Sequence, residues 1–425
     1  MSQRLSLVRF VKALGPGLIT GAADDDPSGI ATYSQSGAQF GFGLTWTMLL
    51  TFPFMVAIQI ISACIGWGAG NGLAKTIAQQ LPKPVVFSLV GLLAIANTIN
   101  IAADLAAMGA SLRLVAGGPA VLYAILFGVA CLVAEVFIPY HRYAGYLKFL
   151  TMVLFVYVAA AFSVHVPWGT VAVSTFVPAL SLDPKLLLTV VAVFGTTISP
   201  YLFFWQASQE AEESRLSHRR RQRIGKDGRT AISPRAFRHI ALDTWTGMFI
   251  SNLIGFFIIV TTAATLHSHG VTKIDTAAQA AEALRPIAGN LTFALFASGI
   301  IGTGLLAVPV LAGSAAYGVA EAFGLRGSLE LPANRALGFY GIVGASTFAG
   351  GALVLTRIDP IAMLFWTAVI NGVIAVPIMF AMMVVVSSAR SLRLFSIPLW
   401  LRWLGWLASA LMAVTVVLLI WSNLS

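Results

Sequence analysis

Apolar stretches of about twenty residues recur eleven times along this chain, and no other feature of the sequence restricts its fold as much. A stretch of that length can cross the hydrocarbon core of a bilayer as one helix. Composition agrees, because only 10% of the residues are charged, against roughly 25% in soluble domains. We therefore expect an all-α membrane protein with about 11 transmembrane helices, at residues 13–40, 43–66, 84–113, 119–137, 146–166, 187–209, 243–266, 291–321, 335–353, 359–387 and 399–423.

Basic residues are distributed unevenly between the loops. If the N-terminus is cytoplasmic and each stretch crosses once, 21 of the 26 Lys and Arg residues lie on the cytoplasmic side, as the positive-inside rule requires. Nine of them belong to a loop at about 210–240, which contains SHRRRQRIGKDGR. No aromatic residue interleaves with that run, as a platform for single-stranded nucleic acid would need. The net charge of +10 is therefore explained by topology, and we expect a lipid bilayer and no nucleic acid as partner.

Three consecutive carboxylates, Asp24–Asp26, stand beside a proline in the middle of the first stretch, GPGLITGAADDDPSGIATYSQSG. Pro27 lacks a backbone donor and its ring clashes with the preceding turn, while Ser28 and Gly29 are poor helix formers. We expect the helix to break between Asp25 and Gly29. Free backbone groups and carboxylates are tolerated at membrane depth only where they line a cavity or bind a ligand. The three aspartates would repel one another unless a cation, protons or partners compensate.

The sixth stretch, VVAVFGTTISPYLFFWQASQE, is interrupted in a similar way at Thr196–Pro200. Two interrupted helices five spans apart are typical of inverted-repeat transporters, whose ion site lies where the breaks meet. Carboxylates, hydroxyls and unwound carbonyls form a hard oxygen site suited to Mg²⁺, Ca²⁺ or Mn²⁺. We expect one transmembrane domain over 1–425 with a leucine-transporter-like five-plus-five inverted repeat. Repeat 1 covers about 11–166 and repeat 2 about 187–387, with the basic loop inside it and an extra helix at about 399–423.

Polar side chains in other spans are further candidates. Asn97, Asn100 and Asp104 follow the spacing i, i+3 and i+7, so they share one face of the third helix. They either line a permeation path or pair with a neighbouring helix. Asn371 is a single amide in the tenth stretch and either serves the path or joins two helices.

These motifs resemble the natural resistance-associated macrophage protein (NRAMP) family of transition-metal transporters. The resemblance rests on GPGLITGAADDDPSGIATYSQSGAQFGFGLTW in the first two stretches, AADLAAMGASLRLV in the third and PYHRYAGYLKFL near the fifth. The family has Asp-Pro-Gly-Asn in its broken first helix and Ala-x-x-Met-Pro-His in its sixth. The resemblance implies that Asp26 is the metal-binding aspartate and that the carbonyl oxygen of Thr196 is a metal ligand.

The departures from the family pattern concern the metal ligands and the titratable groups. Gly29 stands where the family has its Asn ligand, Ser199 where it has a Met thioether, and Tyr201 where it has His. Asp104 is kept, but Ala107 replaces the glutamate of the DLAE pattern. Loss of the thioether removes a preference for soft ions, and the small residues widen the site for a partly hydrated Mg²⁺. The sequence thus resembles a divergent branch, the NRAMP-related magnesium transporters.

We therefore expect an importer of Mg²⁺, and also of Mn²⁺, that works by alternating access around a midplane site without an obligatory proton. The transported ion is its substrate, and we expect no cofactor, no enzymatic activity and a monomer. We expect it in a bacterial inner (plasma) membrane with a cytoplasmic N-terminus. The expected metal contacts are Asp26, Gly29, Thr196, Ser199 and Asp25. Residues expected around them or along the path are Asp24, Asn100, Asp104, Tyr201 and Asn371.

Three other functions are compatible with parts of this pattern. A proton-coupled Mn²⁺ or Fe²⁺ importer would use Asp24, Asp25 or Asp104 for the proton, and stimulation by an inward proton gradient would favour it. A transporter of a small organic solute on the same fold would need protonated aspartates or a cationic substrate. A non-transporting scaffold or receptor would gain nothing from interrupted helices.

Overall fold

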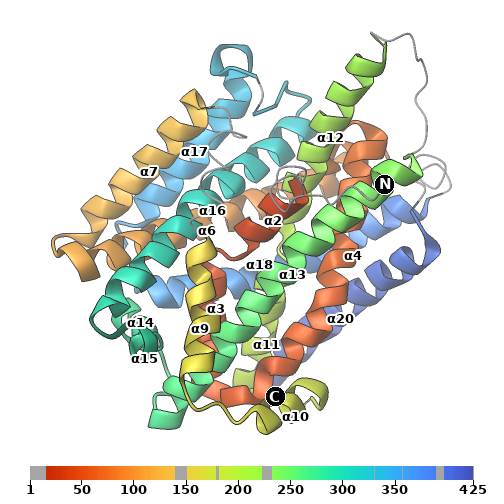
Figure 1. Cartoon of the computed structure of the whole chain (residues 1–425). Coiled ribbons are helices and arrows are strands. Elements are labelled where there is room, and N and C mark those ends of the chain that lie inside the picture. Colours follow the sequence, from red (N-terminus) through yellow and green to blue (C-terminus); the bar gives the residue numbers. More distant parts are fainter. Residues whose placement is uncertain are drawn as a thin grey trace, which may run out of the picture.

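The computed structural model describes residues 16–138, 151–178, 181–222, 232–329, 331–356, 358–388 and 397–424, and within them it contains helices and no strand (Figure 1). The all-α prediction is therefore confirmed. The PYHRYAGYLKFL motif and residues 223–231 of the basic loop lie outside the described residues.

The helices are α2 (Pro16–Asp24), α3 (Pro27–Phe40), η1 (Gly41–Leu44), α4 (Thr45–Ala69), α5 (Leu73–Ala78), α6 (Lys83–Ala116), α7 (Ala120–Phe137), η2 (Thr151–Leu154), α9 (Phe155–Ser163), α10 (Trp168–Phe176), α11 (Pro184–Thr197), α12 (Pro200–Gln222), α13 (Pro234–Thr265), η3 (His267–His269), α14 (Ala277–Glu282), α15 (Arg285–Ala288), η4 (Gly289–Leu291), α16 (Thr292–Ala322), η5 (Ala333–Arg335), α17 (Leu337–Leu353), α18 (Pro360–Ser387) and α20 (Leu399–Leu424).

Several helices begin at a dipeptide made of a capping residue and a proline. Asp183–Pro184 begins α11, Ser233–Pro234 begins α13 and Asp359–Pro360 begins α18, and each capping side chain accepts a backbone N–H of the first turn. Proline fits the first helical position, where its missing N–H costs nothing. The same kind of dipeptide occurs inside two spans, as Asp26–Pro27 and Ser199–Pro200. Each break is therefore a helix start that lies within the membrane.

Both predicted breaks are confirmed. The first span is interrupted at Asp25–Asp26, between α2 and α3, and the sixth at Ile198–Ser199, between α11 and α12. Pro27–Gly29 form the first turn of α3 and not part of the break, because proline is compatible with a helix start. In Figure 1, α2 and α12 extend from the centre towards the upper side, and α3 and α11 towards the lower side.

The helices occupy all eleven predicted stretches, but not as eleven separate long helices. By length and composition, eight helical segments among the described residues can cross a membrane, or nine if one bent pair is counted as a span. The first two predicted spans join through η1 into the continuous segment Pro27–Ala69. The ninth, α17, has only 17 residues. The bent pair is Met152–Ser163 and Trp168–Phe176, with 119° between its halves.

The structure differs from the predicted loops in two places. Helix α10, which forms the second half of the bent pair, lies in a connection for which no helix was predicted. The basic loop expected at about 210–240 is shorter, because α12 continues to Gln222 and α13 begins at Pro234.

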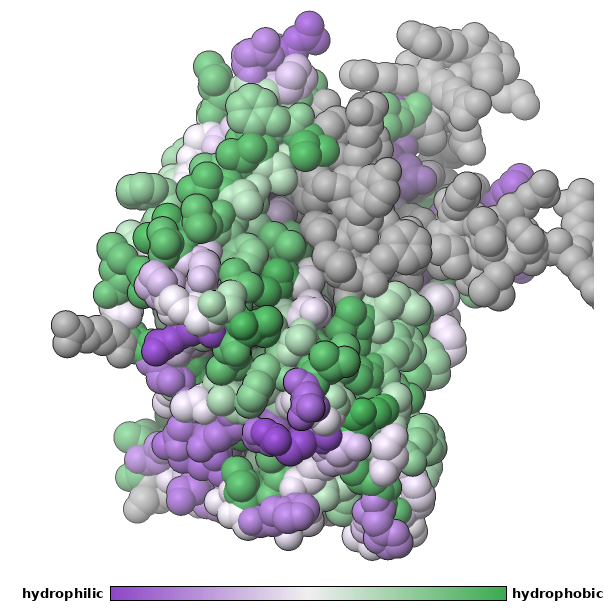
Figure 2. Space-filling view, turned by 60° about the vertical axis from the view of Figure 1, so that its left-hand side comes forward, coloured by the Kyte–Doolittle hydropathy of each residue, from purple (hydrophilic) through white to green (hydrophobic). Residues whose placement is uncertain are grey.

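Large hydrophobic side chains lie on the outside of the helix bundle. Phe137 is 77% exposed, Phe348 80% and Trp403 69%. Figure 2 shows hydrophobic residues over much of the visible face, with hydrophilic residues gathered towards its lower end and its top. A monomeric soluble protein rarely exposes so large an apolar surface. Together with the spans, this identifies a multi-pass membrane protein.

The broken helices touch their neighbours backbone to backbone. An added Cβ at Gly21 of α2 would lie 2.3 Å from the carbonyl carbon of Gly247 on α13. One at Gly195 of α11 would lie 2.1 Å from the carbonyl oxygen of Ala368 on α18. In addition, the carboxylate of Asp243 on α13 accepts a backbone N–H from the first turn of α2 at 2.7 Å. Helices α2 and α11 are thus seated directly on α13 and α18.

This packing makes glycine necessary at Gly195. We expect Gly195→Ala to lower the thermal unfolding temperature in detergent, because the new methyl group meets the backbone of α18 and overpacking costs about 1–3 kcal/mol. Gly91→Ala is the matched control, since a Cβ there meets nothing within 4 Å and alanine favours a helix by about 1 kcal/mol. Equal unfolding temperatures for the two variants would contradict the close approach of α11 and α18.

The two cysteines of the chain are free thiols. Cys64 of α4 and Cys131 of α7 are 0% and 2% exposed. Both therefore lie inside packed helix interfaces.

Candidate ion-binding site at the two helix breaks

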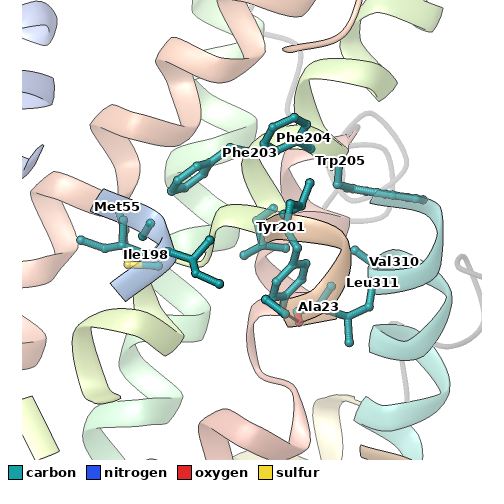
Figure 3. Close-up of a cluster of buried hydrophobic side chains, with 14 of the residues drawn as sticks. Ala23, Met55, Ile198, Tyr201, Phe203, Phe204, Trp205, Val310 and Leu311 are labelled. Carbon is teal, nitrogen blue, oxygen red and sulfur yellow. Dashed lines mark hydrogen bonds between the residues drawn. The ribbon is translucent and has the colours of Figure 1, made fainter. Parts of the chain in front are cut away.

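The two helix breaks meet in the core. An added Cβ at Gly29, in the first turn of α3, would lie 3.2 Å from Oγ1 of Thr196 at the end of α11. It would also lie 3.4 Å from the carbonyl oxygen of Asp24. On the other side of the breaks, the hydroxyl of Tyr201 in the first turn of α12 donates to the carbonyl oxygen of Ala23 at 3.0 Å, and the two residues face each other in Figure 3.

Asp26 is the N-cap of α3, and its two carboxylate oxygens have different surroundings. Oδ1 accepts hydrogen bonds from Gly29 N and Ser28 Oγ, each at 2.7 Å. Oδ2 accepts from Asn100 Nδ2 of α6 at 3.3 Å and lies 3.5 Å from the hydroxyl of Tyr201. The residue is 1% exposed. Oδ1 is thus used to start α3, whereas Oδ2 has only two long contacts.

Asp24 and Asp25 share a hydrogen-bond partner on α13, a helix that does not contact the carboxylate of Asp26 through any hydrogen bond described above. Ser251 Oγ of α13 lies 2.5 Å from Asp24 Oδ2 and 3.0 Å from Asp25 Oδ1. The other oxygen of Asp24, Oδ1, is buried without a hydrogen-bond partner. The described residues hold no group of three His, Cys, Asp or Glu side chains placed to share a metal ion. The three consecutive carboxylates therefore face different helices: Asp24 and Asp25 contact α13, and Asp26 contacts α6 and α12.

Thr196 and Ser199 bring neutral oxygen atoms to the end of α11. Ser199 Oγ lies 2.8 Å from the carbonyl oxygens of both Gly195 and Thr196, to which it donates. A hydroxyl has one proton, so the two contacts share it and the lone pairs of the hydroxyl stay available. Thr196 and Ser199 are both buried.

The residues expected around the site lie at different places. Asn100 and Tyr201 contact Asp26 directly, as described above. Asp104 lies one turn further along α6, and neither of its oxygens has a hydrogen-bond partner. Asn371 of α18 precedes Gly372, which packs on Gly195 near the end of α11, and both polar atoms of its amide are also without a partner.

Sequence reasoning missed Ser251 and Glu135. A serine in an apolar span gives no signal of its own, and only the packing of α13 on α2 shows what Ser251 contacts. Glu135 is the one carboxylate in α7, and it is buried with both oxygens unpartnered. An acidic residue in an apolar helix is a functional candidate in its own right, so that signal was available.

Comparison with known proteins shows that the chain resembles a family of metal transporters. The family model described as natural resistance-associated macrophage protein-like matches residues 17–422. A divalent metal cation transporter MntH from Yersinia pestis is 27% identical over 300 residues, which cover 69% of this chain and 68% of that protein. The protein of that name from Mesorhizobium japonicum is 25% identical over 305 residues, which cover 70% of this chain and 64% of that protein.

Solved structures show the same fold at low identity. The Eremococcus coleocola manganese transporter, in complex with an aromatic bis-isothiourea substituted compound, has a TM-score of 0.73 at 17% identity, covering 98% of this chain and 87% of that one. Mhp1, a nucleobase-cation-symport-1 family transporter, has a TM-score of 0.61 at 14% identity, covering 97% and 90%. The leucine-transporter-like five-plus-five architecture with broken helices 1 and 6 is therefore confirmed.

Proposed function

The chain belongs to the natural resistance-associated macrophage protein-like family, and we propose that it imports divalent metal cations, mainly Mg²⁺ and also Mn²⁺, across a bacterial inner membrane. The names of its relatives support the class of substrate: two are divalent metal cation transporters, and the structural neighbour is a manganese transporter. Membership of this family of transporters also confirms that the chain is not an enzyme. A cytoplasmic N-terminus is supported by the basic loop between α12 and α13.

The observation that carries this proposal is Oδ2 of Asp26, which is buried where the two breaks meet and only weakly engaged. Around the same junction lie the carbonyl oxygen of Thr196 and the hydroxyl of Ser199. Mg²⁺ is usually bound through one or two carboxylates and keeps several of its waters. One weakly engaged carboxylate oxygen among neutral oxygens fits that mode of binding.

The preference for Mg²⁺ follows from the absence of sulfur at the break itself. Ile198 and Ser199, which form the break in the sixth span, carry no thioether. Met55 of α4 does carry a thioether, but it belongs, together with Ile198, to a cluster of buried hydrophobic side chains (Figure 3). Oxygen ligands alone give no advantage to softer ions over the harder Mg²⁺.

Import without a proton is supported by the residues that this chain has at the two positions where the family has titratable His and Glu side chains. The hydroxyl of Tyr201 is engaged with Ala23 and Asp26, and Ala107 has no group to titrate. The membrane potential supplies a driving force of its own. For a divalent ion it amounts to about 4.6 kcal/mol per 100 mV, because one elementary charge contributes about 2.3 kcal/mol.

A second candidate, proton-coupled Mn²⁺ import, is favoured by the contacts of Ser251. This hydroxyl lies within hydrogen-bond distance of both Asp24 and Asp25 but has only one proton to donate. The second contact becomes a hydrogen bond when one of the two carboxyl groups carries a proton. Coupled transport would use that proton.

Uptake into proteoliposomes separates the two candidates. We expect the purified protein to take up Mg²⁺ and Mn²⁺ down their gradients, faster when the interior is negative and at the same rate with or without an inward pH gradient. Acceleration by the pH gradient together with a preference for Mn²⁺ would favour the coupled candidate. Ca²⁺ uptake is measured alongside, and liposomes without protein give the background. If no divalent ion enters, both candidates are wrong.

A further inference from the structure

A row of buried oxygen atoms without hydrogen-bond partners follows one face of α6 past Asp26. Asn97 Nδ2 donates to the carbonyl oxygen of Leu311 on α16 at 2.9 Å, and Asn100 Nδ2 donates to Asp26 Oδ2 at 3.3 Å. Both amide groups are oriented by these bonds. Their oxygens, and both carboxylate oxygens of Asp104 on the same face, are left without a partner.

The unpaired atoms of Asn97, Asn100 and Asp104 are all acceptors, and among the described side chains the helices around α6 offer no buried charged donor. Buried polar atoms are normally satisfied, so a set made only of acceptors points to a missing cation or to the water around one. On α6 itself, Lys83 and Arg113 stand at the two ends. Helices α3, α7, α16, α17 and α18 pack on α6, and none of them contains Lys, Arg or His. Helices α5 and α12 also contact α6, and their described cationic side chains, Lys75 and Arg215, are exposed.

We propose that Asn100 and Asp104 form a second cation subsite, which the transported divalent ion occupies before or after it binds Asp26. This proposal rests on the function proposed above. Residues four apart on a helix have Cβ atoms about 5–6 Å apart, a distance that the waters around one Mg²⁺ can bridge. Asn100 links the two subsites, since its Nδ2 contacts Asp26, its Oδ1 has no hydrogen-bond partner, and Asp104 lies one turn away on the same face.

Charge supports one ion shared between the subsites. Asp104 lies one helical turn along α6 from Asn100, which contacts Asp26. With the ion bound and both groups ionised, two carboxylates balance a single divalent ion, whereas two ions at once would repel each other across a short distance. The ion therefore moves between Asp26 and Asp104, and each carboxylate holds it for part of the passage.

The first test is the concentration dependence of Mg²⁺ uptake by full-length variants in proteoliposomes. We expect Asp104→Asn to raise KM for Mg²⁺ about tenfold, a loss equivalent to about 1.4 kcal/mol, and Asp104→Glu to recover most of that loss. Asp359→Asn is the matched control, because it makes the same chemical change at the N-cap of α18, where Asn also caps a helix, and should leave KM unchanged. An unchanged KM in Asp104→Asn, or an equal rise in the control, would overturn the proposal.

The second test is equilibrium binding of Mn²⁺ to the purified protein. We expect Asp26→Asn to keep one weakened site and the double variant Asp26→Asn/Asp104→Asn to bind no Mn²⁺. If the wild type transports Mg²⁺ but both variants bind Mn²⁺ equally, the second subsite is wrong and the proposed function stands. A wild type that carries no divalent ion removes the proposed function instead. A shifted pH profile of uptake in Asp104→Asn, with KM and binding unchanged, would identify a proton site and overturn the cation subsite.

Discussion

Asp26→Asn is expected to reduce the initial rate of Mg²⁺ and Mn²⁺ uptake by about 100-fold while leaving the protein folded. Removing one partner of a buried charge pair costs about 2–5 kcal/mol, and each 1.4 kcal/mol is a factor of about ten. Asn caps a helix as well as Asp does, so the hydrogen bond from Gly29 N that starts α3 is retained. Asp26→Ala would remove the helix cap as well as the charge, so the effect on uptake could not be separated from the effect on folding. Uptake into proteoliposomes gives the rate, and thermal unfolding in detergent reports the fold.

Asp183→Asn provides the matched control for this variant. Asp183 is also an N-cap followed by proline, at the exposed start of α11. The same chemical change there should leave uptake at the wild-type rate. Wild-type uptake by Asp26→Asn would show that Asp26 is not the charged ligand, and the central proposal would fail.

Ser199→Met is expected to shift selectivity from Mg²⁺ towards Mn²⁺ by about tenfold or more, because it restores a soft ligand at the end of α11. The position suits this test, since Ser199 Oγ lies 2.8 Å from the carbonyl oxygen of Thr196, which is a proposed metal ligand. The larger side chain should also slow transport, because Ser199 is buried and overpacking costs about 1–3 kcal/mol. The informative quantity is therefore the ratio of Mn²⁺ transport to Mg²⁺ transport. It is measured by letting Mn²⁺ compete with Mg²⁺ for uptake.

Ser199→Ala separates the thioether from the loss of the hydroxyl. It removes the oxygen without adding sulfur, so its ratio of Mn²⁺ to Mg²⁺ should stay close to that of the wild type. Identical ratios in Ser199→Met, Ser199→Ala and the wild type would show that the ligand at this position does not set selectivity.

The two helix breaks could be predicted from sequence because their signal is local. Pro53, Pro309 and Pro377 also lie inside spans, yet α4, α16 and α18 continue through them. Those prolines follow Phe52, Val308 and Val376, which have no side-chain oxygen to cap a new helix. Pro27 follows Asp26, whose side chain caps α3, and Pro200 follows Ser199, whose hydroxyl donates to carbonyl oxygens at the end of α11. In both places a side-chain oxygen satisfies a backbone group that the break leaves free. The preceding residue thus decides whether a proline interrupts the span.

The division of the three aspartates could not be predicted, because it depends on packing between distant segments. Asp24, Asp25 and Asp26 are equivalent in the sequence, but Ser251 of α13 contacts the first two and Asn100 of α6 contacts the third. These contacts join residues more than seventy positions apart. For the same reason Tyr201 could be recognised only as a departure from the family pattern, whereas the structure shows its hydroxyl between Ala23 and Asp26.

The burial of both native thiols makes this chain a suitable background for chemical labelling. Cys64 and Cys131 are enclosed by neighbouring helices, so in this conformation a water-soluble thiol reagent finds no accessible sulfur in the unmodified protein. A single cysteine introduced on the face of α6 that follows Asn100 would react only when that face opens to one side of the membrane. Reagents added separately inside and outside vesicles would then report the direction and timing of each opening, without first removing any native residue.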